Sequence, residues 1–136
     1  MLRPMLRKKR LSEEERLVGA FLAAGRVAIG AGIWAAPGLT AKALGMKAFD
    51  GEALALARLA ATRDLILGAW LGAELRDGGS PLAPATALTA CDACDALAFG
   101  LLAARGGDGR SAGMKGLAAA GPATALGAWF VTRLRG

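Results

Sequence analysis

Six ionisable side chains lie inside otherwise apolar stretches of this sequence, and their chemistry needs an explanation. They are three arginines and three aspartates, namely Arg26, Arg58, Arg63, Asp64, Asp92 and Asp95. At the centre of a membrane each isolated charge costs about 2.5 to 3.5 kcal/mol, so six unpaired charges would oppose insertion by more than about 10 kcal/mol. We therefore expect these charges to pair between helices.

The spacing of the charges predicts that they face the interior. Asp92 and Asp95 are three residues apart and share one helix face, and Arg63 shares a face with Leu67. The charges then either line a polar cavity that binds a small molecule or relays protons, or form structural ion pairs. For Arg58, which is nearer the end of its segment, snorkelling to the interface is a further alternative.

The stretch "CDACD" from residue 91 to residue 95 raises two further hypotheses. Cys91 and Cys94 have the spacing of a redox dithiol, but the chain has no second cysteine pair to pass electrons onward. The two aspartates, with Arg58 and Arg63, could hold a magnesium diphosphate, although the acidic motif is short. We favour small buried thiols and ion-paired aspartates, and expect no metal and no cofactor.

Composition excludes several function classes. The 136 residues include no histidine, which excludes histidine-based catalysis. The net charge is +6, but the basic residues flank apolar blocks rather than forming a stripe with aromatics, so we expect no nucleic-acid partner. A membrane surface accounts for the charge better. Alanine, leucine and glycine supply most of the apolar content, which predicts an all-α fold.

Four apolar blocks of about 20 residues each are long enough to span roughly 30 Å of hydrocarbon. The predicted spans are residues 17–36, 53–75, 82–104 and 114–134. The predicted fold is a four-helix transmembrane bundle, with one domain over residues 17–136 after a basic and acidic cytoplasmic segment over residues 1–16. This segment begins with basic residues like a signal peptide, but lacks a clear cleavage site, and we expect it to be retained.

Local signals mark where the helices begin and end. Ser12 and Glu15 have the spacing of a capping box, which predicts a helix start in a charged turn. Pro37 and the glycine after it are expected to stop the first helix. Ser80 is predicted as the N-cap of the third block, with the following proline at the first helical position.

A soluble alanine-rich bundle is the alternative to a membrane protein. The stretches "LILGAWLGA" and "ALAFGLLAA" argue against it, because they leave no polar face for water to solvate. The membrane interpretation is therefore preferred, despite the charges that interrupt the blocks.

The lysines and arginines at the ends of the spans predict the orientation. The side that holds both termini carries nine of them: Arg3, Arg7, Lys8, Lys9, Arg10, Arg16, Arg76, Arg133 and Arg135. The opposite side carries five: Lys42, Lys47, Arg105, Arg110 and Lys115. This bias predicts a multi-pass protein with both termini in the cytoplasm.

Small residues recur at four-residue spacing, which lets helix backbones approach closely in lipid. The rows are Ala20, Ala24, Ala28 and Gly32, then Gly68 and Gly72, then Gly121 and Ala125. We interpret them as ordinary close packing between helices.

Three stretches carry a resemblance to a known group of proteins: "GRVAIGAGIWAAPGLTAKALG", "ATRDLILGAW" and "ACDACDALAFG". Together they resemble the small four-span membrane proteins of GC-rich actinobacteria that are grouped as a domain of unknown function. The likeness covers roughly residues 17–133. It implies the topology and the bacterial inner membrane, and it supplies no activity or site.

The function expected from the sequence is that of a non-enzymatic structural or accessory membrane component. Its expected partners are the lipid bilayer and either a second copy or another membrane protein, contacted through the small-residue faces. The alternative is a small-molecule binding or proton-coupled transport module that uses the central charges. An enzyme ranks last, because it would need the thiol or magnesium chemistry set aside above.

Overall fold

The computed structural model describes residues 10–136, and these residues form helices and no strands. In chain order the helices are α1 (Glu13–Ala35), α2 (Pro37–Ala43), α3 (Gly51–Arg76), α4 (Leu82–Ala104) and α5 (Gly109–Arg135). The all-α prediction is confirmed. Most of the predicted 1–16 segment, with four of the basic residues counted for orientation (Arg3, Arg7, Lys8 and Lys9), lies outside the described residues.

Two of the four long helices, α1 and α4, are long and apolar enough by themselves to cross a membrane. The other two predicted spans, α3 and α5, are not apolar enough by the same measure. In α3 the reason is charge, because Arg58, Arg63 and Asp64 lie within its central turns. In α5 the reason is composition, because glycine, threonine and Pro122 dilute the aliphatic residues. The structure thus supports two candidate spans and four long helices.

The start of α1 follows the predicted capping box. The backbone N–H of Glu15 donates to Ser12 Oγ at 3.1 Å, and the backbone N–H of Ser12 donates to Glu15 Oε2 at 2.9 Å. Both bonds satisfy amide groups that lack helical partners. This prediction is confirmed.

The stop predicted at Pro37 is confirmed, since α1 ends at Ala35 and the backbone of Ala36 is not helical. Proline is tolerated at the first position of a helix, where its missing N–H costs nothing, and Pro37 starts α2 directly after Ala36. The short helix α2 then folds back beside α1, where a Cβ built on Gly32 would lie 2.6 Å from Thr40 Oγ1. A fifth helix was therefore missed.

The predicted cap of α4 is displaced by one residue. Pro81, rather than Ser80, occupies the N-cap position, and no side chain caps this helix. Instead, the backbone N–H of Ser80 donates to Glu74 Oε2 at 2.7 Å, which fixes the turn between α3 and α4.

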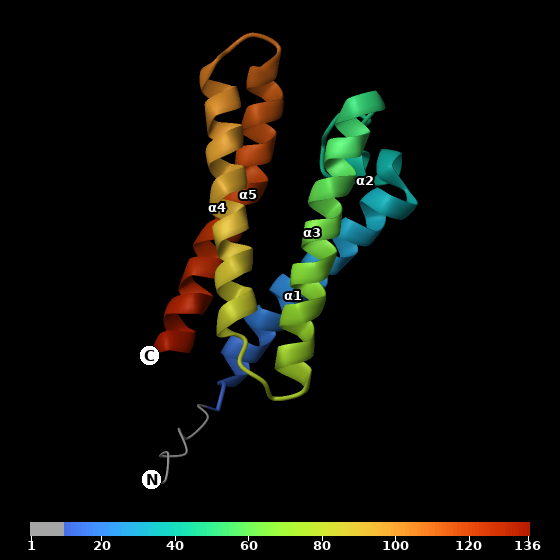
Figure 1. Cartoon of the computed structure of the whole chain (residues 1–136). Helices are drawn as coiled ribbons and strands as arrows, with labels where there is room; N and C mark the ends of the chain where they lie inside the picture. Colours follow the sequence, from blue (N-terminus) through green and yellow to red (C-terminus); the bar gives the residue numbers. More distant parts are fainter. Residues whose placement is uncertain (1–9) are drawn as a thin grey trace, which may run out of the picture.

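The long helices are arranged as two pairs, α1 with α3 and α4 with α5 (Figure 1). The two pairs lie close together near the end of the molecule that holds the C-terminus, and they diverge toward the end that holds α2 and the α4–α5 turn. The start of α1 lies at the same end as the C-terminus. The two helix pairs are therefore close together at one end of the molecule and apart at the other.

Glycines bring the helices of each pair together. A Cβ at Gly68 of α3 would lie 2.8 Å from the carbonyl oxygen of Ala23, and one at Gly30 of α1 would lie 2.7 Å from that of Ala61. In α5, a Cβ at Gly113 would overlap the backbone of Ala103 in α4. Backbones this close leave no room for any side chain.

Most of the predicted small-residue rows lie elsewhere. Ala20, Ala24 and Ala28 are exposed, and a Cβ at Gly121 would have no neighbour within 4 Å. Close packing within the chain is therefore not seen at those positions. Next to Ala20, Ala24 and Gly121, the adjacent small residues Gly19, Ala23 and Ala120 are buried instead.

An apolar core joins the two pairs where they meet. It consists of Leu22, Ala23, Leu71, Ala85, Leu88, Phe130 and Val131, which come from α1, α3, α4 and α5. Phe130 and Leu71 are fully buried, as expected for residues at the centre of a four-helix contact.

Candidate functional site

The central charges lie one helical turn beyond the apolar core. Arg26 follows Leu22 by four residues in α1, and Asp92 follows Leu88 by four residues in α4, so each charged group continues the inward face of its helix. This placement follows from helical periodicity. It puts the charges where the two pairs begin to diverge.

Arg26 links three helices. Its Nη1 donates to Asp64 Oδ1 of α3 at 3.3 Å, and its Nη2 contacts Asp92 Oδ1 of α4. One guanidinium group therefore holds a carboxylate from each of the two helix pairs.

Arg63 extends the same chain of ion pairs toward the surface. It donates to both oxygens of Asp95, with Nη1 3.0 Å from Oδ1 and Nη2 2.7 Å from Oδ2. Its Nε and Nη2 also approach Asp64 Oδ1, at 3.2 and 3.1 Å. Asp64 Oδ1 is thus shared between Arg26 and Arg63.

We call this chain of five residues the Arg–Asp ladder, in the order Asp92, Arg26, Asp64, Arg63 and Asp95. Its inner end is buried, since the side chains of Asp92 and Asp64 are 2% and 10% exposed. Its outer end is partly open, since those of Arg63 and Asp95 are 31% and 32% exposed. The ladder therefore runs from the interior to the edge between α3 and α4.

The sixth predicted site residue, Arg58, lies apart from the ladder. Its guanidinium carbon is 5.1 Å from the centre of the Trp34 ring, a cation–π contact between α3 and α1. Trp34 Nε1 also donates to Thr62 Oγ1 at 3.1 Å. The structure thus places Arg58 against an aromatic ring rather than among the five residues of the ladder.

Trp34 and Thr62 were missed by the sequence interpretation. A tryptophan four residues after a glycine in an apolar helix carries no signal of its own. The signal that could have identified Trp34 is Arg58, one helical turn before Thr62. A cation within an apolar segment needs an electron-rich or acidic neighbour.

Two polar atoms near the site are buried without a hydrogen-bond partner, Asp92 Oδ2 and Arg58 Nε. A buried carboxylate oxygen without a donor costs free energy. The ladder holds three carboxylates and two guanidinium groups, so it is also short of one positive charge.

The ladder joins three helices, because its arginines come from α1 and α3 and its aspartates from α3 and α4. Its groups bond to one another. Cys91 and Cys94 are both free thiols, the first half-buried and the second exposed. Within residues 10–136 no three histidine, cysteine or acidic side chains come together as a metal site.

Comparison of the chain with protein families, with curated proteins and with solved structures found no match.

Proposed function

We propose that this chain is a small, non-enzymatic integral protein of the bacterial inner membrane. Four of its helices span the membrane, and both termini lie in the cytoplasm. It acts as a structural or accessory component that associates with a second copy or with another membrane protein. The resemblance to four-span bacterial membrane proteins supports the same topology.

The observation that carries this proposal is the inverted polarity of the middle of the molecule. Ile66 and Leu97 are 62% and 65% exposed, whereas the charged Asp64, two residues before Ile66, has a side chain only 10% exposed. A protein in water places such groups the other way round. Lipid favours this arrangement, because it solvates the aliphatic side chains and leaves charges to pair inside.

The surroundings of α1 and α4 also support a membrane location. Of their most apolar stretches, only 28% and 11% of the residues are buried inside the molecule. The core helix of a soluble protein would be mostly buried. Helices this apolar and this exposed need an apolar partner around them.

The ladder supplies the reason that α3 could cross as well. Arg63 and Asp64 would oppose insertion if they were isolated, but each has an oppositely charged neighbour within 3.3 Å. Pairing with good geometry offsets much of the cost of removing charges from water. α5 carries its charges near its two ends, where they reach an interface.

A topology measurement tests the proposal. In a variant in which Cys91 and Cys94 are replaced by alanine, a single cysteine is introduced at Ser80 or at Ser111, both exposed. We expect a membrane-impermeant thiol reagent to label Ser111→Cys in intact cells and Ser80→Cys only after lysis. Release of the protein from membranes by alkaline carbonate, or labelling of both sites from the same side, would refute it.

The unpartnered Asp92 Oδ2 favours one second candidate, a small-molecule binding or proton-coupled transport module. The outer end of the ladder is partly open, and the inner end holds an atom that could accept a proton or a ligand donor. If this candidate is correct, Asp92→Asn keeps the fold and abolishes pH-dependent uptake in proteoliposomes. If the ladder is structural, the same variant chiefly lowers thermal stability.

A further inference from the structure

Arg58 is the one central charge that has no counter-charge in the described part of the chain. The other five bond to one another in the ladder, whereas the guanidinium group of Arg58 makes no ion pair and no hydrogen bond. Its Nε is buried without an acceptor, and the residue as a whole is half-buried. A cation removed from water in this way costs free energy unless another molecule supplies the acceptor.

The charges around Arg58 leave a surplus of one positive charge at this end of the α1–α3 pair. Between residues 36 and 58, Lys42 and Lys47 are matched in number by Asp50 and Glu52, and Arg58 is the additional cation. The residues three and four positions away on α3, which share its face, are Leu54, Ala55, Ala61 and Thr62. Since none of them is acidic, the face of α3 that carries Arg58 offers it no counter-charge.

Trp34 fixes the position of this cation. The guanidinium carbon of Arg58 is 5.1 Å from the centre of the Trp34 ring, and Trp34 Nε1 donates to Thr62 Oγ1 at 3.1 Å. The ring covers one face of the guanidinium group, while Nη1 and Nη2 are not buried. Two such N–H groups side by side bind the oxygens of a phosphate as paired donors.

The contact between Arg58 and Trp34 lies near the end of the helix pair that holds α2. Trp34 is the last residue but one of α1, and Arg58 follows the first residue of α3 by seven positions, roughly 10 Å. Helical side chains lean toward the N-terminus, so Arg58 reaches back toward the start of α3. In the predicted span 53–75 this is the extracytoplasmic interface, where tryptophan is enriched and long cationic side chains meet lipid headgroups.

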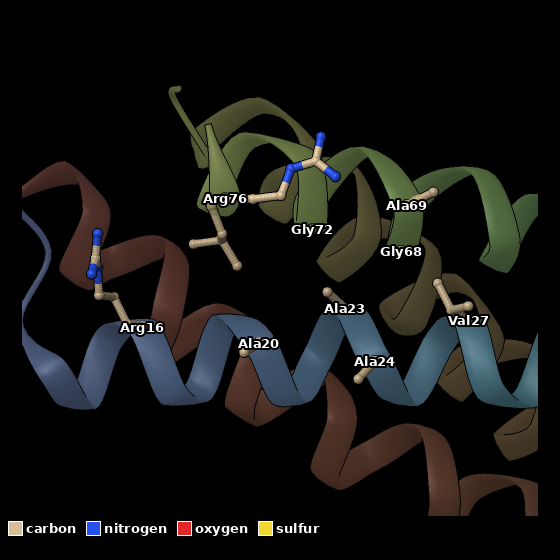
Figure 2. Close-up of a pocket in the computed structure, with 10 residues that line it drawn as sticks. Arg16, Ala20, Ala23, Ala24, Val27, Gly68, Ala69, Gly72 and Arg76 are labelled. Atoms are coloured by element: carbon tan, nitrogen blue, oxygen red, sulfur yellow. The ribbon is translucent and has the colours of Figure 1, made fainter. Parts of the chain in front are cut away.

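The surface that continues from this contact toward the middle of the molecule is apolar. Val27 lies seven residues before Trp34 on the same face of α1, and Ile66 lies four residues after Thr62 on α3. Their side chains are 37% and 62% exposed. Val27 also borders a shallow hollow together with Gly68 (Figure 2). A ligand that joins an anion to an acyl chain therefore fits this side of the molecule better than a small soluble anion.

We propose that Arg58 binds the phosphate of an anionic phospholipid in the extracytoplasmic leaflet. The inference rests on the proposed membrane location. Nη1 and Nη2 donate to two phosphate oxygens, Trp34 lies beside the headgroup, and an acyl chain lies over Val27 and Ile66. The lipid thus supplies the counter-charge that Arg58 lacks within the chain.

An acidic group of a second copy is a poorer match for this site. Copies inserted in one orientation present the same residues at the same depth. The acids inside the predicted spans are already bonded within the chain. They are Asp64, Asp92 and Asp95 of the ladder, and Glu74, which accepts two hydrogen bonds. A second copy therefore has no free acid to offer at the depth of Arg58, whereas a phospholipid has its phosphate there.

The test uses Trp34 as a local reporter of the lipid beside Arg58. The full chain has three tryptophans, so Trp70→Phe and Trp129→Phe leave Trp34 as the only one. This protein is reconstituted into phosphatidylcholine vesicles that contain either brominated phosphatidylglycerol or the same fraction of brominated phosphatidylcholine, since bromine quenches tryptophan fluorescence on contact. We expect a relative association constant that favours phosphatidylglycerol about fivefold, and Arg58→Gln should abolish that preference. Arg105→Gln, an exposed change on the same side of the membrane in the other helix pair, should leave it unchanged.

A measurement without phospholipid distinguishes a lipid from free phosphate as the ligand. In detergent micelles, we expect inorganic phosphate at millimolar concentration to leave the emission of Trp34 unchanged. A saturable change that disappears in Arg58→Gln identifies free phosphate as the ligand and overturns the lipid site.

The remaining outcomes separate this inference from the proposed function. Equal quenching by the two brominated lipids in the protein that retains Arg58, if the protein stays in membranes after a carbonate wash, overturns the lipid site alone. That result requires no Arg58 variant to fold. Loss of a dimer in Arg58→Gln with unchanged quenching identifies an acidic group of a second copy as the partner and also overturns it. A wild-type chain that leaves the membrane in the wash overturns the membrane proposal itself.

Discussion

The two helix pairs differ in how their members are joined. In α4–α5 the contacts are steric, with Gly113 of α5 against the backbone of Ala103, and no ion pair joins α4 to α5 in the described residues. In α1–α3 comparable glycine contacts exist, yet an ion pair between Arg26 and Asp64 is added. A pair can thus form without charges, whereas ion pairs of the ladder join one helix pair to the other.

The largest expected effect comes from removing the central arginine of the ladder. Arg26→Ala leaves the buried Asp92 and Asp64 without their shared partner, and removal of one member of a buried ion pair costs about 3 to 5 kcal/mol. We expect a corresponding loss in the free energy of unfolding, measured by denaturant titration in detergent.

A double variant sharpens that result. Asp92→Asn in the Arg26→Ala background removes the stranded charge, and we expect it to restore part of the lost free energy. Unfolding free energies that simply add would show that Arg26 and Asp92 do not act as a pair.

A glycine substitution in α5 tests the pair that lacks charges. In Gly113→Ala the new methyl group would overlap the backbone of Ala103, and we expect a loss of about 1 to 3 kcal/mol, as for other overpacked sites. Gly121→Ala is the matched control in the same helix, because its Cβ meets no neighbour within 4 Å. Thermal unfolding of both variants checks the prediction; an equal effect would mean that close approach at Gly113 is unimportant.

The outer end of the ladder should matter less than the inner end. Asp95→Asn removes a partner of Arg63, but Arg63 retains Asp64, and both side chains of the lost pair are about one-third exposed. Partly exposed ion pairs are screened by water, so we expect a loss of at most about 1 kcal/mol. A loss as large as that in Arg26→Ala, measured in the same titration, would contradict the gradient of burial along the ladder.

The smallest effect is expected for the contact between Arg76 and Asp77, in the turn that links α3 to α4. The hydrogen bond from Arg76 lowers the pKa of the exposed Asp77 below its ordinary value, and the nearby positive charge adds to the shift. A lowered pKa stabilises the folded state at pH values above the ordinary pKa of an aspartate. That stabilisation is lost as the pH falls through the lowered pKa. Both groups are exposed, so Arg76→Gln should raise the pKa of Asp77, measured by NMR, without changing the unfolding temperature at neutral pH.

Much of the helical layout could be predicted from local sequence. The third block, residues 82–104, coincides with α4, because proline and glycine signals bound it on both sides. The capping box at Ser12 was also recognisable, since it depends on two side chains three residues apart. The stop at Pro37 was also recognisable, but the short helix α2 that begins there was missed, because a proline that ends one helix is also accepted at the first position of the next.

The partners of individual charges were harder to infer. Helical spacing placed Asp92 and Asp95 on one face, but periodicity alone does not say that Arg26 meets one and Arg63 the other. Which arginine meets which aspartate depends on how far the helices of one pair are displaced along their axes relative to those of the other pair. The small-residue rows misled for a related reason, since alanine is so frequent that exposed and packed faces both show four-residue spacing.

The division into two pairs has a consequence for synthesis of the chain. The α1–α3 half is made first and carries Arg26, Arg58 and Arg63 against Asp64 alone, while the α4–α5 half contributes only acidic groups, Asp92 and Asp95, to the middle of the molecule. Each half emerges from the ribosome with a charge that the other half cancels. The middle of the finished protein thus combines two halves of opposite charge, and we expect halves encoded separately and cut at Gly78 or Gly79 to attract each other.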